Sequence, residues 1–241
     1  MGGRRVTGVF LQVRIGSTRL PGKALLDLCG RPVVEHAMSS LRRLPASHHV
    51  LLTDSGSAES LRPAAARCGF ELFVGPGENV LERFVLASRG YGVDEIVRAT
   101  GDNPFVSWEL ARLAVVLLRR EGADYAAFDG PPLGTGVEVV RAAALETALR
   151  ETDDPYDREH VTPYLYRNPD RFACRRVLSP PAYRCPGARV TLDTEVDYRT
   201  IVRICESVFD GDPPSVIRLV SRLREHGHSC ESEEHVPATR A

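Results

Sequence analysis

The stretch VTGVFLQVRIGSTRLPGKAL, residues 6–25, decides the fold because it joins a buried strand to a basic, glycine-rich loop. The apolar run 6–13 predicts a strand, since it is short, continuous and followed at once by turn-forming residues. The loop after it contains Arg14, Gly16, Arg19, Gly22 and Lys23. A glycine-rich turn with a lysine directly after a strand is typical of phosphate binding.

Two features separate this loop from the P-loop of Walker A proteins. Five residues, rather than four, stand between Gly16 and Gly22, and Ala24 takes the place of the Ser or Thr whose hydroxyl binds magnesium. The segment ALLDLCG then delays the next helix until about Pro32. The loop therefore predicts a different kind of phosphate site, and a solvated basic turn is an equal alternative when the loop is taken alone.

Downstream of the loop, apolar runs alternate with segments of helical spacing. We expect strands at 48–53, 70–74, 95–100 and 123–128, and helices at 32–44, 58–69, 78–92 and 107–122. Ser107 suits the N-cap of the last of these helices, and Glu109 places a negative charge in its first turn. Strands separated by single helices predict a mostly parallel sheet with helices on both faces.

The pattern loosens in the second half of the chain. There we expect a helix at 142–151, strands at 172–178 and 188–193, and helices at 195–209 and 214–226. We interpret residues 1–226 as one domain. Residues 227–241 have no periodicity, and we expect them to form a disordered tail.

Composition limits the partners and the compartment. The 241 residues include 31 basic and 32 acidic side chains, so net charge gives no reason to expect nucleic acid or a membrane as partner. The six cysteines form no C-x-x-C pair, which argues against a zinc site or a disulfide framework and fits free thiols in a reducing cytoplasm. No apolar run approaches the length that spans a membrane.

Two aspartates lie at the ends of expected strands. Asp102 lies in the turn RATGDNP, and Asp193 lies in RVTLDTEVDY. The carboxyl ends of parallel strands are where ligands bind in a doubly wound sheet, so both carboxylates are candidates to hold a metal ion that bridges substrate phosphates. A turn-forming role for Asp102 and a helix cap at Asp193 are the ordinary alternatives.

QVRIGSTRLPGKALLDLCGRPVVEH (12–36) resembles the opening signature of the sugar nucleotide cytidylyltransferases, which include CMP-Kdo synthetase and acylneuraminate cytidylyltransferase. The nearest branch is the one labelled spore-coat polysaccharide biosynthesis protein F, which has counterparts of 96–106, 154–172 and 190–198. The resemblance implies a Rossmann-like nucleotide-diphospho-sugar transferase fold, α/β with a mixed, mostly parallel central sheet. It also implies that 130–187 form an insertion for acceptor binding and dimerisation.

The resemblance implies roles for individual residues. Lys23, Arg14 and Asp102 would be catalytic, and Asp102 and Asp193 would bind Mg²⁺. The nucleotide would be bound by Leu11, Gln12, Val13, Arg14, Gly16, Ser17, Arg19 and Lys23, with main-chain groups of 11–13 facing the cytosine. The acceptor would be bound by Glu138, Arg158, Glu159 and His160. The sequence departs from the branch at Gly136, where an aspartate is frequent, and at Asn103, where a cysteine is frequent.

The resemblance therefore implies transfer of CMP from CTP to an acidic sugar or a phosphorylated acceptor, with release of pyrophosphate. The resemblance places the reaction in the synthesis of surface polysaccharide or glycoconjugate precursors and implies a homodimer. The alternative is a nucleotide-sugar-binding glycosyltransferase or a non-catalytic relative on the same fold. The first would need an Asp-x-Asp motif where only Asp102 stands, and the second should have lost Lys23 or an aspartate.

Overall fold

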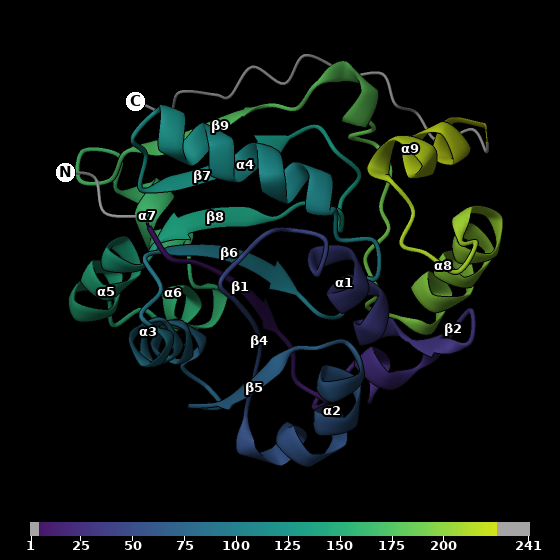
Figure 1. Ribbon diagram of the computed structural model, residues 1–241, viewed down its shortest axis with the longest axis horizontal. Helices are drawn as coiled ribbons and strands as arrows, with labels where there is room; N and C mark the ends of the chain where they lie inside the picture. The colour runs from purple at the N-terminus through teal and green to yellow at the C-terminus, as the bar shows by residue number, and fades with distance from the viewer. Residues whose placement is uncertain (1–4, 226–241) are drawn as a thin grey trace.

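The structure, a computed structural model, describes residues 5–225. Its centre is a seven-stranded sheet of order β5-β4-β1-β6-β8-β7-β9 (Figure 1). The strands are β1 (Thr7–Gln12), β4 (His48–Thr53), β5 (Glu71–Val74), β6 (Glu95–Thr100), β7 (Tyr125–Asp129), β8 (Glu138–Arg141) and β9 (Cys174–Leu178). A two-stranded hairpin, β2 (Asp27–Leu28) and β3 (Arg31–Pro32), stands apart from this sheet.

The sheet is mixed, as the sequence predicts. Strands β5, β4, β1 and β6 are parallel, and β7 is parallel to β9, while β8 runs antiparallel to both of its neighbours. After β1 the chain builds outward through β4 to β5 and then returns to β6 on the other side of β1. Strand order therefore reverses between β1 and β6, the place where such sheets bind ligands.

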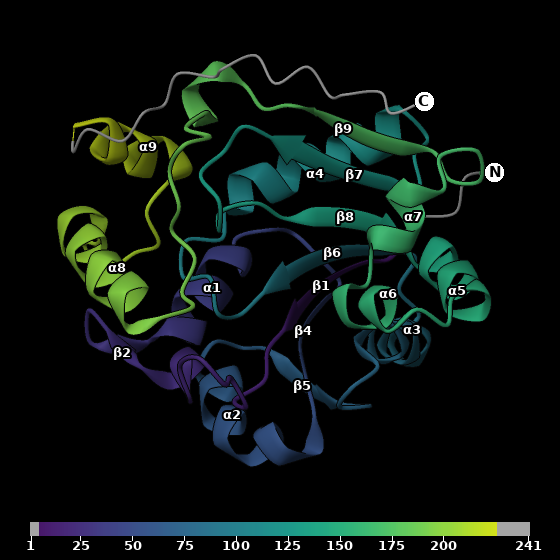
Figure 2. The same ribbon diagram turned by 180° about the vertical axis from the view of Figure 1, so that it is seen from behind.

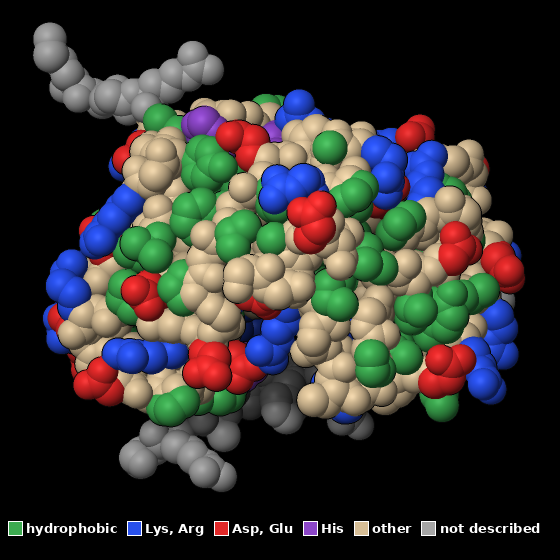
Figure 3. Space-filling model, turned by 90° about the horizontal axis from the view of Figure 1, so that it is seen from below, with side chains coloured by type: hydrophobic (Ala, Val, Ile, Leu, Met, Phe, Trp, Pro, Cys, Tyr) green, Lys and Arg blue, Asp and Glu red, His purple; other side chains and the backbone are tan. Residues whose placement is uncertain are grey.

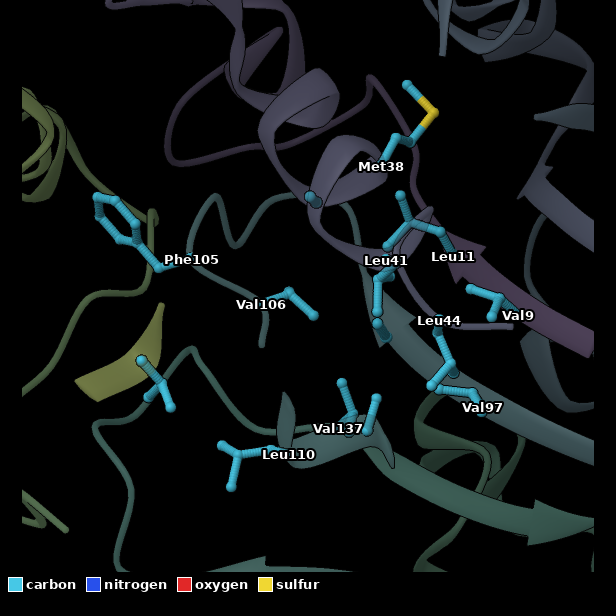
Figure 4. Packing of buried hydrophobic residues seen from close by; sticks show 14 of the residues in the cluster. Val9, Leu11, Met38, Leu41, Leu44, Val97, Phe105, Val106, Leu110 and Val137 are labelled. Carbon is cyan, nitrogen blue, oxygen red and sulfur yellow. The ribbon is translucent and has the colours of Figure 1, made fainter. Parts of the chain in front are cut away.

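Helices cover both faces, and alternate residues of the strands divide between two apolar cores. Val9 and Leu11 of β1 belong to the core under α1, α2 and α4, whereas Phe10 belongs to the core under α3 and α5. Figure 4 shows Leu41 of α1 beside Leu11 and Val9. The helices are α1 (Val33–Leu41), α2 (Ser55–Arg67), α3 (Val80–Tyr91), α4 (Trp108–Arg120), α5 (Ala142–Glu151), α6 (Pro155–His160), α7 (Pro163–Arg167), α8 (Glu195–Val208) and α9 (Val216–Glu225).

Helices α8 and α9 close the end of the sheet toward which β6 points. Both views place α8 beside the β2–β3 hairpin, far from it in sequence (Figures 1 and 2). The hydroxyl of Tyr198 on α8 donates to the carbonyl of Asp27 in that hairpin. The C-terminal helices thus bring residues near 193 back to the N-terminal loop.

The sequence analysis predicted one strand that does not form, and it did not predict β2, β3 or β8. Residues 188–193 form no strand; they make one isolated bridge, between Leu133 and Arg189. The apolar alternation there has another cause, because Val190 and Leu192 are buried in the core beneath an otherwise irregular segment. The expected disordered tail, 227–241, lies outside the described residues.

Two further observations concern membrane-spanning helices and cysteines. Among the described residues, no helix has the length and apolar character needed to span a membrane. Cys29, Cys68, Cys174 and Cys205 are free thiols, as the sequence analysis expects, whereas Cys185 is disulfide-bonded, which it does not expect.

Candidate active site

A cavity of about 340 Å³ lies at the carboxyl ends of β1 and β6. Gln12 and Thr100, the last residues of these two strands, line it, and the loop 14–23 forms one wall. Asp102, Asp193 and the end of α6 complete the wall. The cavity therefore stands at the point where strand order reverses, and the loop that opened the sequence faces it.

Lys23 lies at the centre of this site, and it is the only lysine in the sequence. It begins a short 3₁₀ helix, Lys23–Leu25, directly after Gly22, whose φ of 68° favours glycine. Its Nζ lies 2.6 Å from Asp102 Oδ2 and 3.0 Å from Asp193 Oδ1, and it donates to the carbonyl of Leu192 at 2.7 Å. Only 8% of the residue is exposed. A largely buried ammonium is thus held between two carboxylates.

Asp102 reaches Lys23 because the turn after β6 packs tightly against β1. The backbone N–H of Gly101 donates to the carbonyl of Gln12 at 2.8 Å. A Cβ at Gly101 would come within 3.0 Å of Val13 and 3.1 Å of Val34, so a larger residue would push the turn away. Asn103 donates to the hydroxyl of Thr100 and closes the turn.

Asp193 is fixed by the start of α8. Thr194 and Asp197 form a capping box, and the Asp197 carboxylate also accepts the backbone N–H of Asp193. The Asp193 carboxylate pairs with Arg19 at 3.0 Å and Arg189 at 2.7 Å, besides Lys23. Burial alone would raise the pKa of Asp193, but the hydrogen bond from Lys23 and the neighbouring arginines hold that pKa below its ordinary value.

The two aspartates suit a divalent metal ion. Among residues 5–225 no group of three or more His, Cys, Asp or Glu side chains could hold a metal by itself. Magnesium-type cations bind through one or two carboxylates together with substrate phosphates. Asp102 and Asp193 already lie on either side of a cation, the Lys23 ammonium. The donor set therefore fits a divalent ion that takes its other ligands from a phosphorylated substrate and water.

Arg14 and the end of α6 face each other across the cavity. Arg14 Nη2 pairs with Glu159 Oε1 at 3.1 Å, and His160 lines the cavity beside them. The next residue, Val161, is fully buried with a φ of 75°, which is unusual for a β-branched residue. This strained backbone turns the chain so that Glu159 and His160 face the cavity while Val161 enters the core beneath α3 and α5.

The structure brings most of the predicted residues to this cavity. Gln12, Val13, Arg14, Gly16, Ser17, Arg19, Lys23, Asp102, Glu159, His160 and Asp193 all line it. Leu11 does not, because its side chain is buried in the core and its backbone lies within the sheet. Arg158 does not either: it pairs with Asp153 at 2.6 Å and lines neither this cavity nor the next.

Glu138 lines a second cavity, of about 520 Å³, which shares Thr100 with the first. Its carboxylate is bound by the guanidinium of Arg98 and accepts hydrogen bonds from Tyr125 at 2.7 Å and Thr162 at 3.0 Å. Arg98 also donates to Gln12 Oε1 at 3.1 Å, so one hydrogen-bonded chain joins the two cavities.

Sequence reasoning missed three arginines at these cavities: Arg83 at the first, and Arg98 and Arg176 at the second. Arg83 lines the first cavity at 2% exposure and donates to the carbonyls of Pro76 and Gly77, each at 2.9 Å. Burial lowers the pKa of its guanidinium. Arg98 lies within β6, where its neighbours Val97 and Ala99 are buried in the core. The sequence does indicate this position, because an arginine between two buried apolar residues of a strand must point to the opposite face of the sheet.

A doubly wound sheet with a cationic loop and two carboxylates at its switch point defines this protein as a nucleotidyltransferase of the Rossmann-like class. The chain belongs to the cytidylyltransferase family: residues 9–210 match the family described as Cytidylyltransferase. It is 35% identical over 203 residues to an uncharacterised protein of Methanocaldococcus jannaschii, covering 83% of each chain. It is 30% identical to the spore coat polysaccharide biosynthesis protein SpsF of Bacillus subtilis, over 93% of this chain and 97% of that one.

Solved structures agree with this family. A cytidylyltransferase from Leptospira borgpetersenii superposes with a TM-score of 0.85 at 25% identity, over 96% of this chain and all of that one. The fold also matches CMP-2-keto-3-deoxy-manno-octonic acid synthetase complexed with CTP (TM-score 0.65, 14% identity, 84% and 99% covered). It matches a Mycobacterium tuberculosis protein in complex with manganese as well (TM-score 0.58, 17% identity, 83% and 99% covered).

Proposed function

We propose that this enzyme transfers CMP from CTP to an acidic sugar or a phosphorylated acceptor and releases pyrophosphate. The observation that carries the proposal is the convergence of Lys23, Asp102 and Asp193, which come from three distant parts of the sequence. The CTP complex of the synthetase with the same fold supports the choice of nucleotide. The family relationship to SpsF supports a role in polysaccharide precursor synthesis.

The charges around the first cavity suit a triphosphate. Its described lining includes four cationic side chains, Arg14, Arg19, Lys23 and Arg83, and three carboxylates, Asp102, Glu159 and Asp193. As the acceptor attacks the α-phosphorus, negative charge develops on the phosphate oxygens and on the departing pyrophosphate. Lys23 would provide a fixed positive charge, and Arg14 and Arg19, both exposed enough to move, would bind phosphate oxygens bidentately.

Asp102 and Asp193 would hold Mg²⁺ on the same side of the cavity. Bound there, the ion would neutralise triphosphate charge and polarise the phosphate oxygens. Lys23 contacts both carboxylates, so it would exchange these partners for phosphate oxygens when the metal–nucleotide complex binds. The manganese complex of a protein with this fold supports a divalent metal.

The second cavity would hold the acceptor. It opens beside Thr100, which lines both cavities, so an acceptor oxygen in the second can approach a phosphate in the first. Glu138 lies in this cavity, as its proposed role in acceptor binding requires, whereas Arg158 faces elsewhere. We therefore leave Arg158 out of the proposed acceptor site. Placing both reactants side by side provides much of the rate enhancement in such a transfer.

A pyrophosphate-release assay tests this function. The protein is incubated with Mg²⁺, each of the four ribonucleoside triphosphates and a panel of acidic sugars and phosphorylated metabolites. We expect acceptor-dependent release with CTP. Release that occurs only with another triphosphate, or no release with any acceptor while CTP fails to bind, would contradict the proposal.

We also propose that the enzyme is a cytoplasmic homodimer that associates through the segment containing α6 and α7. Tyr156 and Tyr166 of this segment are 54% and 38% exposed, a pattern that suits an aromatic interface. Sedimentation velocity should give twice the chain mass of 26.5 kDa. A single species at the chain mass across micromolar concentrations would contradict the dimer.

A further inference from the structure

The floor of the second cavity is a row of charged residues across the sheet. Arg98 on β6 lies opposite Glu138 on β8, Glu138 lies opposite Ala127 on β7, and Ala127 lies opposite Arg176 on β9. Residues directly opposite each other on neighbouring strands face the same side of a sheet. The register therefore places two arginines and a carboxylate on one face, with the small Ala127 leaving room between Glu138 and Arg176.

Each of these charges has a partner of opposite sign. Arg98 binds Glu138, and Arg176 binds Asp129 through Nη2 at 2.5 Å and Nε at 3.2 Å. Among the residues described, these two arginines and two carboxylates are all the charged side chains that line the cavity. The side chains of Arg98 and Glu138 are only 13% and 21% exposed. The second cavity is thus lined by two ion pairs, whose charges sum to zero.

The first cavity has a different balance of charged lining residues. There, cations outnumber carboxylates, as a polyanionic triphosphate requires. On the outer surface seen from below, basic and acidic side chains are interspersed, and no large region carries charge of one sign (Figure 3). The difference in charge between the two cavities therefore comes from their own lining residues. It indicates that the two cavities bind ligands of different net charge.

An acceptor that carries only a negative charge would be bound poorly here. To pair closely with Arg98 it would compete with Glu138, whose carboxylate is only 21% exposed and is costly to leave without a cation. The same competition at Arg176 and Asp129 costs less, because those side chains are 47% and 46% exposed. An acceptor with an acidic group and an ammonium group avoids this cost. Its anion can pair with an arginine while its ammonium pairs with the released carboxylate, so that every charge keeps a partner.

We propose that the acceptor is a zwitterion of sugar size, with one acidic group and one amino group, bound between the ion pairs Arg98–Glu138 and Arg176–Asp129. This inference rests on the proposed cytidylyl transfer and narrows its acceptor. Simple sugar acids and phosphorylated sugars, which carry uncompensated negative charge, are the less favoured acceptors of this cavity.

A matched panel tests the charge preference directly. Glucose, glucosamine, glucuronic acid and 2-amino-2-deoxyglucuronic acid share one pyranose ring and differ only at C2, where an amine replaces a hydroxyl, and at C6, where a carboxylate replaces a hydroxymethyl group. Their binding is measured by ligand-observed NMR in the presence of Mg²⁺ and α,β-methylene CTP, which blocks transfer. We expect the amino acid sugar to bind about tenfold more tightly than the other three, as one charge-assisted hydrogen bond would give. Equal binding, absent binding or a preference for glucuronic acid would overturn the inference.

Two variants should shift the preference in opposite directions. Glu138→Gln removes a carboxylate and should favour glucuronic acid. Gly136→Asp adds a carboxylate and should favour glucosamine; a Cβ at this position meets no heavy atom within 4 Å, so the change leaves the fold intact. Glu146→Gln, which breaks a surface pair with Arg89, is the matched control and should keep the wild-type order. Unchanged preference in both cavity variants would refute the role of these ion pairs.

The outcome can be told apart from failure of the proposed function. If CTP binds and is consumed but simple sugar acids are the better acceptors, only the inference about charge balance fails. If CTP neither binds nor releases pyrophosphate, the cytidylyl transfer itself fails.

Discussion

Lysine occurs once in this chain, and every other member of its 31 Lys and Arg residues is arginine. The exception lies where three contacts converge on one ammonium, from Asp102, Asp193 and the Leu192 carbonyl. An ammonium is compact and can donate in three directions, whereas the planar guanidinium of arginine would not fit between these partners. The composition of the chain and the geometry of the site therefore point to a specific need for lysine at position 23.

Substitution of Lys23 tests this need. We expect Lys23→Ala to lower pyrophosphate release by about 10²- to 10³-fold, as loss of one preorganised charge does elsewhere. Lys23→Arg keeps the charge and should recover only part of the rate, because its geometry differs. Single-turnover assays at saturating CTP measure both variants, with circular dichroism to confirm folding. Wild-type turnover in a folded Lys23→Ala protein would disprove the assignment.

The depressed pKa of Asp193 predicts an acid dependence of stability. Because the folded carboxylate releases its proton more readily than the unfolded one, its stabilising effect is complete above the unfolded pKa of about 3.9 and disappears as pH falls through the lower folded value. Lys23→Met removes a cause of the shift. Urea unfolding should show wild type and variant differing most near pH 6 and converging below pH 4. A difference that stays constant over this range would contradict the linkage.

Asp102 makes a prediction about the metal. Asp102→Asn keeps the size of the side chain and removes its charge, so Mg²⁺ and Mn²⁺ should bind the CTP complex at least about tenfold more weakly. Isothermal titration measures this affinity. Asp153→Asn is the control, because Asp153 is almost fully exposed and pairs with Arg158 away from both cavities. A wild-type metal titration for Asp102→Asn would remove this residue from the proposed ligands.

The residues that cap helix α8 also position a residue of the candidate site. The capping box of Thr194 and Asp197 stabilises the helix and also holds the backbone of Asp193. Ser107 caps α4 by a single hydrogen bond, with its hydroxyl accepting the N–H of Leu110, and it lines neither cavity. The two caps should therefore stabilise the folded protein to a similar extent, but only the cap of α8 also holds a residue of the candidate site.

Removing each cap separates these effects. Thr194→Ala and Ser107→Ala should each lower the free energy of unfolding by about 1 kcal/mol. Only Thr194→Ala should also slow pyrophosphate release, since it loosens Asp193. Chemical denaturation and steady-state assays supply the two measurements. Equal activity in both variants would show that Asp193 is held by its ion pairs alone.

The same elements show what a sequence can predict. The parallel core was predictable because each strand is apolar and each helix has regular spacing and caps such as Ser107. Strand β8 was not, because only Val139 and Val140 are buried in its four residues and glycines precede it. Helices α6 and α7 are too short for periodicity to indicate them. The segment 188–193 looked like a strand because its alternate apolar residues enter the core.

The site residues also divide into those that the sequence marks and those that only the structure reveals. The loop and Asp102 were found because each directly follows a strand whose end the sequence marks. Asp193 was found for a wrong reason, since the strand expected at 188–193 does not form and the start of α8 positions this residue instead. Arg98 was missed, since its role depends on the register with β8, a strand that the sequence did not reveal. Arg158 was assigned to the acceptor, but its neighbour Glu159 points to the cavity instead, and the direction of adjacent side chains on a short helix is set by tertiary packing.

A cytidylyltransferase must also distinguish one base from another in its nucleotide cavity. CTP, UTP, ATP and GTP carry the same triphosphate, so Lys23, Arg14 and the metal would stabilise all four alike. Any difference among them in the melting temperature isolates the contribution of the base, because a ligand stabilises the folded state according to its own affinity. The proposed cytidylyl transfer predicts that this contribution is largest for cytosine.

We therefore expect CTP with Mg²⁺ to raise the melting temperature more than the other three nucleotides. At about one hundred times its dissociation constant, CTP would add about 2.7 kcal/mol. For a domain of this size that corresponds to a shift of about 5 to 10 °C. Differential scanning fluorimetry provides the measurement, and the Lys23→Ala variant should lose most of the shift for every nucleotide alike. Equal shifts for CTP and UTP would mean that the site reads only the size of the base, and the cytidine preference would then have to come from the transfer step.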